Sequence, residues 1–199
     1  MENGSGRGVK RVTVKGNKVT EIFRNNYVVQ KLIEQHPSLS AFNESSVNVV
    51  RVTTMFLGKN IFHLGSAFRF GGEGAFTDNT VTKDGKGMTV VGIDAEGKLR
   101  DKGYFSCGIS TKKSHTGVVF DGYEIPKHNE MVRIALKQHS HFPSIGIIGW
   151  DFTVDKDDNL ITVEYNIKAP GVLYYQWVNG PLFGDRTQEI LDGIKEFSK

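Results

Sequence analysis

The stretch IGWDFTVDKDDNLITVEYNIKAPG (residues 148–171) carries three oxygen-bearing side chains among aliphatic and aromatic neighbours: Asp151, Glu164 and Asn166. The polar turn DKDDN predicts a hairpin, in which side chains alternate between the two faces. Glu164 and Asn166, two residues apart, therefore share a face, and Asp151 on the partner strand could meet them across the ladder. Such oxygens suit Mg²⁺, which commonly bridges protein carboxylates to nucleotide phosphates. The alternative is that Asp151 is an exposed strand residue and that the other two lie solvated at a strand end.

Two arginines interrupt apolar strands elsewhere in the chain. Arg51 lies in VNVVRVTTMFLG (47–58), and Arg69 lies in NIFHLGSAFRFG (60–71), just before a glycine-rich loop. A guanidinium buried in such a strand needs a partner. That partner is either an internal carboxylate, which gives a structural ion pair, or a phosphoryl group undergoing transfer.

Two loops and a helix end supply the other candidates. In GSGRGVKR (4–11), Gly4, Ser5, Gly6 and Gly8 would bring backbone N–H groups and cations near phosphates, unless the segment is only a tail or an expression scar. Asp78 and Asn79 either close over a substrate or cap a turn. We interpret His139 and His141 as cations at a helix end, because their spacing lacks a third metal ligand.

The elements that must position these residues are mostly strands. Alternating patterns and tight turns predict strand pairs, and Pro126 marks the start of a helix. The strands expected around the candidate residues are 47–58, 60–71, 145–154 and 160–167. The βαβ alternation of a doubly wound sheet is missing, and no linker divides the chain. We therefore expect an α+β fold, a mainly antiparallel sheet with helices packed on one face.

The overall composition limits the possible partners. The formal net charge of the 199-residue chain is only +3, so nucleic acid is not the default partner. The single cysteine, Cys107, excludes an internal disulfide and fits a reducing compartment. Neither a signal peptide nor a run of about 20 apolar residues is found, so we expect a cytoplasmic protein without a membrane span.

Several segments together resemble one protein family in their order along the chain. The spacing of Asp151, Glu164 and Asn166, with E-x-N on a strand, resembles the metal-binding hairpin of the ATP-grasp superfamily. The wider set resembles its sugar-transfer-associated branch, which is linked to surface polysaccharide synthesis. The matching segments are GSGRGV (4–9), YVVQKLIEQHPSLSAFNESSVNVVRVTT (27–54), FRFGGEGAFTDN (68–79), VGID (91–94), GYEIP (122–126), IGWDFTV (148–154), and VEYN (163–166) followed by Pro170-Gly171 and Gln176.

The resemblance implies an ATP-dependent ligase type of chemistry. ATP and Mg²⁺ would be the cofactors, and a small-molecule or saccharide carboxylate would be activated as an acyl phosphate and then attacked by an amine or other nucleophile. Arg69 and Arg51 would stabilise the phosphoryl oxygens. Gln30, Lys31 and Ile33 would form the hinge that contacts adenine, although the same apolar run also fits an ordinary core strand.

The chain also departs from the family pattern. The family places a lysine-bearing strand and a further subdomain before the glycine-rich loop, whereas this sequence starts at the loop, and Gln30 replaces the usual hinge glutamate. We expect residues 1–199 to form a single C-terminal ATP-grasp portion that lacks the N-terminal nucleotide-cleft subdomain. A separate N-terminal subunit or a homo-oligomer would then cover its exposed face. A non-catalytic half-domain that binds nucleotide or a partner, and a β-rich scaffold without any ligand, are the alternatives.

Overall fold

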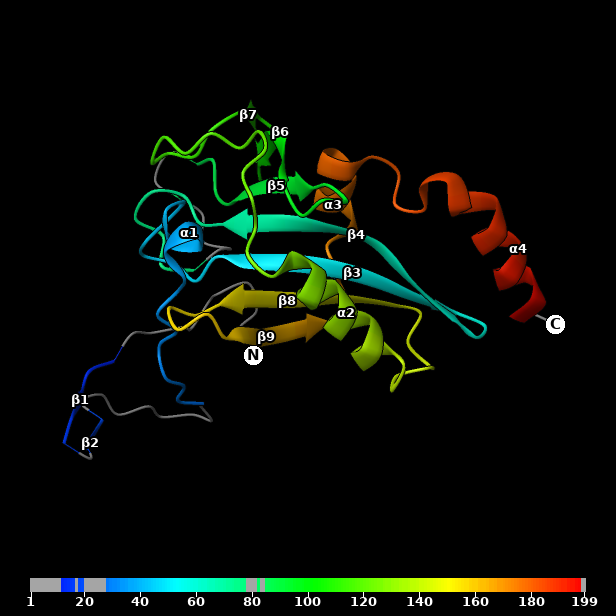
Figure 1. Ribbon diagram of the computed structural model, residues 1–199, viewed down its shortest axis with the longest axis horizontal. Helices are drawn as coiled ribbons and strands as arrows, with labels where there is room; N and C mark the ends of the chain where they lie inside the picture. Colours follow the sequence, from blue (N-terminus) through cyan, green and yellow to red (C-terminus); the bar gives the residue numbers. More distant parts are fainter. Residues whose placement is uncertain (1–11, 17, 20–27, 78–81, 83–84, 198–199) are drawn as a thin grey trace.

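One antiparallel sheet organises the protein. The computed structural model describes residues 12–16, 18–19, 28–77, 82 and 85–197 (Figure 1). The main sheet has seven strands in the order β7-β6-β5-β4-β3-β8-β9, and all its neighbours pair antiparallel. Its strands are β3 (Val49–Leu57), β4 (Asn60–Phe70), β5 (Thr89–Ile93), β6 (Leu99–Phe105), β7 (Ser110–Thr111), β8 (Ile147–Val154) and β9 (Leu160–Asn166). A separate two-stranded hairpin joins β1 (Val14–Lys15) to β2 (Lys18–Val19).

Short helices surround this sheet and confirm the predicted α+β class. They are α1 (Pro37–Ser40), α2 (His128–His139), α3 (Val172–Asn179), the 3₁₀ helix η1 (Gly184–Arg186) and α4 (Thr187–Phe197). The predicted helix from Pro126 begins two residues later, because Lys127 adopts a left-handed conformation with φ 57°. None of the helices in the described ranges is long and apolar enough to cross a membrane.

The helices are divided between the two faces of the sheet rather than gathered on one. Helix α2 lies across β3, β4 and β8, whereas α3 packs against β4, β5 and β6 from the other side (Figure 1). Both faces are apolar in this region, because all five residues of β5 are buried. A continuous apolar strand gives no alternation from which a single covered face could be inferred.

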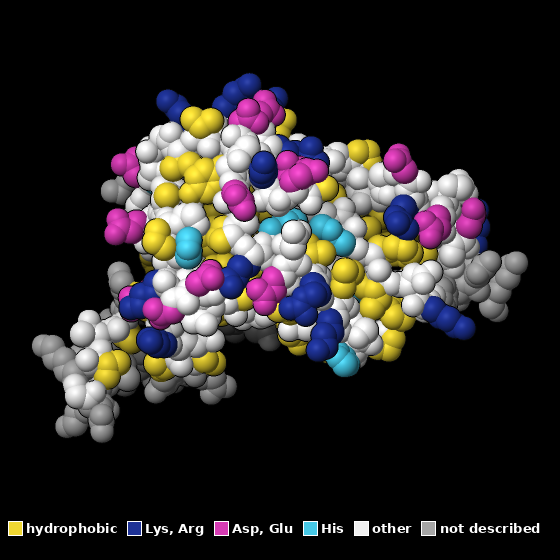
Figure 2. Space-filling view, in the orientation of Figure 1, with side chains coloured by type: hydrophobic (Ala, Val, Ile, Leu, Met, Phe, Trp, Pro, Cys, Tyr) yellow, Lys and Arg dark blue, Asp and Glu magenta, His cyan; other side chains and the backbone are white. Residues whose placement is uncertain are grey.

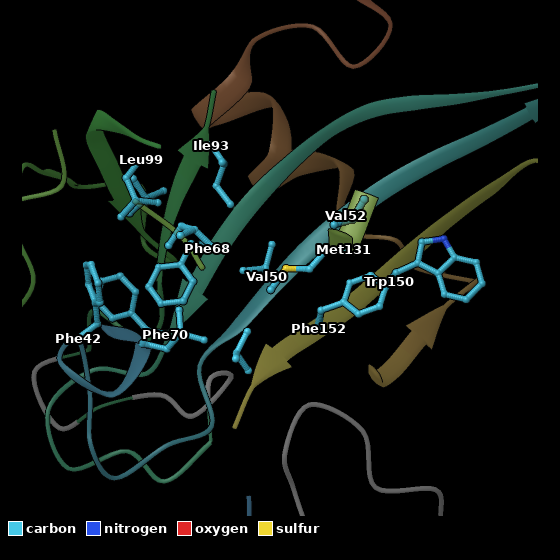
Figure 3. Packing of buried hydrophobic residues seen from close by; sticks show 14 of the residues in the cluster. Phe42, Val50, Val52, Phe68, Phe70, Ile93, Leu99, Met131, Trp150 and Phe152 are labelled. Carbon is cyan, nitrogen blue, oxygen red and sulfur yellow. The ribbon is translucent and has the colours of Figure 1, made fainter. Parts of the chain in front are cut away.

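The main core lies between the sheet and α2. Val50 and Val52 of β3 and Phe152 of β8 point toward Met131 of α2, and each of these side chains is buried (Figure 3). Phe42, just after α1, closes one end of this core with its ring centroid 4.9 Å from that of Phe68. Because successive strand residues face opposite sides, burial of these residues turns the intervening ones toward the other face.

His139 is a core residue, so its interpretation as a helix-end cation is wrong. Its side chain is buried, and its Nδ1 lies 2.7 Å from Oγ1 of Thr54. That hydroxyl also accepts a hydrogen bond from Nε1 of Trp150 at 2.8 Å, so its own proton is directed to His139. The other ring nitrogen, Nε2, donates to the carbonyl of Ile145 at 2.8 Å. Burial lowers the pKa of His139, and the neutral ring links the end of α2 to β3 and β8.

Charged side chains of both signs are interspersed on the face that carries α2, without one large patch of either sign (Figure 2). Some histidines lie near the middle of that face, and others lie apart from them toward its edges. The candidate site lies on the opposite side of the sheet.

Candidate functional site

The register of the sheet brings all five predicted catalytic and metal-binding side chains to one face. Arg51 pairs with Asp151 across β3 and β8, and Asp151 pairs with Glu164 across β8 and β9. Asn166 follows Glu164 by two residues and pairs with Gly149, while Arg69 pairs with Val49 on β4 and β3. Val50, Val52 and Phe152 face α2, so the polar residues between them face away from it.

A β-bulge gives Glu164 its orientation. Phe152 pairs with Thr162, but Asp151 pairs with Glu164, so Val163 is an extra residue on β9. In an unbroken register Val163 would stand opposite Asp151, and Glu164 would point toward α2. Bulges of this kind re-aim side chains next to functional sites. The three oxygen donors therefore share one face of the sheet only because of this bulge.

Asp151 is held by two arginines. Its side chain is almost completely buried, and Arg51 binds it in a bidentate manner, with Nε 2.7 Å from Oδ1 and Nη2 2.5 Å from Oδ2. Nη1 of Arg69 lies 3.7 Å from Oδ2 of the same carboxylate. Both arginines thus have the internal carboxylate partner that their burial requires. This arrangement also gathers two positive charges at one point of the face.

Glu164 and Asn166 complete the cluster. Nδ2 of Asn166 donates to Oε1 of Glu164 at 3.3 Å and to Oδ2 of Asp151 at 3.4 Å, so both carboxylates approach the same amide. Burial, and to a smaller extent the facing Asp151 carboxylate, raise the pKa of Glu164. Two carboxylates and an amide, which also carries a carbonyl oxygen, are donors that fit Mg²⁺. Among the described residues, no group of three or more His, Cys, Asp or Glu side chains could hold a metal ion. A metal site here therefore needs the amide of Asn166 as a ligand.

Two glycines that the sequence analysis did not assign to the site enclose Arg51. A Cβ on Gly171 would lie 2.8 Å from Nη1 of Arg51, and one on Gly149 would lie 3.3 Å from Cδ. The carbonyl of Pro170 accepts a hydrogen bond from Nη1 at 3.3 Å. Gly171 also has φ +86°, which favours glycine. The sequence feature that could have indicated this contact is the break in the strand pattern at Pro170-Gly171. Its neighbour in the structure, Arg51, lies more than a hundred residues earlier in the chain.

The predicted hinge lies beside the hairpin on the same face. Nε2 of Gln35 donates to Oγ1 of Thr153 at 2.8 Å, which holds this segment against β8. Lys31 and Ile33 line a shallow depression together with Ile161, the register partner of Thr153. Thr153 lies two residues from Asp151 on the strand, so its register partner Ile161 lies on the same face of the hairpin as the oxygen cluster.

The hinge residues do not form a core strand, which excludes that alternative for the described part of the run. Residues 28–33 have no regular secondary structure, and Gln30 is exposed. Val28, Val29 and Leu32 expose 83%, 52% and 52% of their surface. An apolar run left exposed beside a polar cluster is typical of a surface that a ligand or another part of a protein covers.

The remaining candidates belong to two loops. Gly4, Ser5, Gly6 and Gly8 of the glycine-rich loop, and Asp78 and Asn79 of the later loop, lie outside the described residues. Their predicted contacts with phosphates or substrate stay predictions.

Comparison with known proteins identifies one family. The family model described as sugar-transfer associated ATP-grasp matches residues 18–192, which is most of the chain, and this confirms the resemblance seen in the sequence. No curated protein and no solved structure matches the chain.

Proposed function

Because the chain belongs to the sugar-transfer-associated ATP-grasp family, we propose that it binds Mg-ATP on the sheet face that carries Asp151 and uses it to activate a carboxylate. The reaction would transfer the γ-phosphoryl group to a small-molecule or saccharide carboxylate. An amine or another nucleophile would then attack the resulting acyl phosphate, and surface polysaccharide biosynthesis is the proposed setting. The single observation that supports this proposal is the convergence of two carboxylates, one amide and two arginines on one face.

The proposed roles follow from the chemistry of each group. Asp151, Glu164 and Asn166 would hold Mg²⁺, which supplies neutralisation of phosphate charge. Arg69 and Arg51 would bind phosphoryl oxygens, since guanidinium groups match their geometry and charge. Phosphoryl transfer of this kind depends on positioning and electrostatics and needs no protein nucleophile.

The adenine would lie in the depression beside β9. Lys31 and Ile33 line it from the hinge, and Ile161 offers an aliphatic surface on the metal-binding side of the hairpin. Gln30 would meet the exocyclic amino group through a neutral amide rather than a carboxylate. In the glycine-rich loop, Gly4, Ser5, Gly6 and Gly8 would approach the phosphates.

The exposed apolar hinge supports a second part of the proposal. Residues 1–199 would act as one C-terminal ATP-grasp portion, and a separate N-terminal subunit or a second copy of the chain would cover Val28, Val29 and Leu32. That element would supply the opposite wall of the nucleotide cleft.

Titration calorimetry with Mg-ATP tests binding at this site. We expect heat of binding for the wild type and its loss in Glu164→Ala and Asn166→Ala. Thr162→Ala is the matched control, because Thr162 is exposed on the same strand and pairs with Phe152 on the α2 side. Equal affinity of all four proteins would contradict the proposal.

The pairing of both arginines with Asp151 favours a second candidate, a half-domain that binds nucleotide or a partner without catalysis. In that case the arginines neutralise the carboxylate and take no part in phosphoryl transfer. Measurement of ADP formation with a panel of sugar acids and amines separates the two. Binding without any ADP formation would favour the non-catalytic protein.

A further inference from the structure

We propose that Arg51 occupies the place of a cation at Asp151, so that the site rejects free divalent metal ions and accepts a metal only together with a polyphosphate. This inference deepens the proposed function and rests on it for the identity of the ligand. It concerns whether the metal ion binds before the polyphosphate or together with it, which the three oxygen donors alone do not specify.

The ion pair between Arg51 and Asp151 uses both oxygens of the carboxylate. Nε and Nη2 bind Oδ1 and Oδ2 at 2.7 and 2.5 Å, which is the bidentate geometry of strong arginine–carboxylate pairs. Arg69 approaches Oδ2 at 3.7 Å, and Asn166 donates to the same oxygen at 3.4 Å. A metal ion that needs an oxygen of Asp151 must therefore compete with a guanidinium already in place.

Among the described residues, the charges of the cluster balance without a metal. The two arginines contribute two positive charges, and Asp151 and Glu164 contribute two negative charges when both are ionised. A free divalent cation would add two positive charges to these four described groups and would have to displace Arg51 from Asp151. A buried carboxylate gains little when one cation replaces another of comparable pairing strength.

A polyphosphate changes this balance. Its oxygens bind a guanidinium in the same bidentate manner as a carboxylate does, so Arg51 can leave Asp151 without losing its partner. The released carboxylate is then available to the metal that accompanies the phosphates. The side chain of Arg51 is 12% exposed and that of Asp151 only 4%, so an incoming anion reaches the guanidinium first.

The surroundings of Arg51 keep it in this position. The Pro170 carbonyl binds Nη1, and the close approach of Gly149 and Gly171 leaves room for the guanidinium but not for a Cβ at Gly171. The bidentate pair of Arg51 with Asp151 is therefore held by backbone contacts to Arg51 as well as by the attraction of opposite charges. Replacement of Arg51 by a neutral residue should open the carboxylate to any cation.

Equilibrium dialysis of Mn²⁺, in which the protein-bound metal is measured against a protein-free sample with the same tripolyphosphate, tests the inference on the whole chain. For the wild type we expect weak binding of Mn²⁺ alone and an affinity at least about tenfold higher with equimolar inorganic tripolyphosphate. For Arg51→Gln we expect Mn²⁺ alone to bind at least about tenfold more tightly than to the wild type. Arg133→Gln, which removes an exposed arginine from α2, is the matched control and should behave as the wild type.

A second variant protects the test against misfolding, which circular dichroism would reveal. Arg51→Lys keeps the positive charge but cannot bind both oxygens, so its affinity for Mn²⁺ alone should lie between those of the wild type and Arg51→Gln. The inference is overturned if the folded Arg51 variants bind Mn²⁺ alone no more tightly than the wild type. It is also overturned if the wild type binds Mn²⁺ equally well with and without tripolyphosphate.

The same series separates this inference from the proposed function. If Arg51→Gln gains affinity for Mn²⁺ but calorimetry detects no ATP binding to the wild type, Arg51 guards a cation site and the nucleotide assignment fails. If the wild type binds Mg-ATP but the Arg51 variants gain no affinity for Mn²⁺, the nucleotide assignment holds and the role of Arg51 as a substitute cation fails.

Discussion

Asp151 of β8 and Glu164 of β9 form a cross-strand pair at the point where the register of the two strands shifts by one residue. The extra residue, Val163, lets both carboxylates face away from α2. Like charges directly opposite each other on a sheet are unfavourable, and the raised pKa of Glu164 reflects burial together with this neighbour. Such a pair is expected where a cation is to be bound.

Removal of one of these charges should separate stability from binding. We expect Glu164→Gln to raise the free energy of unfolding of the ligand-free protein at neutral pH by less than about 1 kcal/mol, since Glu164 is only partly shielded from solvent and the remaining solvent screens its repulsion with Asp151. The same variant should lose affinity for Mg-ATP. Urea denaturation and calorimetry measure the two effects, and Glu124→Gln, at another exposed position, is the control. A destabilised Glu164→Gln protein would show that the carboxylate stabilises the fold.

The contact of Gly171 with Arg51 can be tested with a pair of glycines. Gly171 has φ +86° and Gly180 has φ +85°, but only a Cβ on Gly171 would meet Arg51, at 2.8 Å from Nη1. Both Gly→Ala variants should lose about 1 kcal/mol of stability through backbone strain. Only Gly171→Ala should also weaken binding of Mg-ATP, because it displaces the guanidinium. Equal binding by both variants in calorimetry would contradict the positioning of Arg51 by this glycine.

The buried network at the end of α2 should be costly to interrupt. Thr54→Val keeps the volume of the side chain but leaves Nε1 of Trp150 and Nδ1 of His139 without their shared partner. We expect a loss of about 2–3 kcal/mol in the free energy of unfolding, measured by urea denaturation. Thr162→Val, at an exposed position of β9, should change it by less than about 0.5 kcal/mol. A similar small change for Thr54→Val would show that water replaces the hydroxyl.

Two histidines on the α2 face predict a loss of stability in acid. The ring centroids of His63 and His128 lie 6.2 Å apart, and the ring nitrogens of the buried His128 have no hydrogen-bond partner among the described residues. Burial lowers the pKa of His128, and desolvation, followed by the charge of His128, lowers the pKa of His63 to about 4. The unfolded chain therefore binds more protons than the folded one below pH 6.5, so stability falls as the pH decreases from about 6.5 toward 4.

Denaturation at several pH values measures this dependence. His63→Asn should flatten the fall in the free energy of unfolding between pH 6.5 and pH 4, whereas replacement of the exposed His115 by Asn should leave it unchanged. An equally steep fall in His63→Asn and in the wild type would assign the acid sensitivity to other groups.

The sequence was sufficient to predict the strands around the site but not their finer contacts. Apolar alternation and turn residues predicted 60–71 and 160–167, and β4 and β9 end within one residue of those bounds. The bulge at Val163 is a local backbone choice that leaves no mark in the pattern of residue types. The bidentate contact of Arg51 with Asp151 joins residues 100 positions apart, so it depends on the register of β3 and β8.

Two predictions about helices, the exposed His139 and the packing of all helices on one face, differ from the structure because both depend on contacts between distant parts of the chain. His139 is a basic residue at the end of a helix, a position typical of an exposed cation. The chain after α2 folds back, however, and encloses His139 together with Thr54 and Ile145. Helix α3 covers the second face of β4–β6 because apolar residues such as Val90 and Val178 meet there, which only the tertiary structure reveals.

The central claim is that Asp151, Glu164 and Asn166 bind one metal ion together with a nucleotide. An anomalous difference map from a crystal grown with Mn²⁺ and a non-hydrolysable ATP analogue tests it most directly. We predict one strong peak about 2.0–2.3 Å from oxygens of these side chains and of the phosphates, with Arg51 turned from Asp151 to a phosphate. A nucleotide bound on the α2 side of the sheet, or a map without any metal near Glu164 and Asn166, would contradict the account.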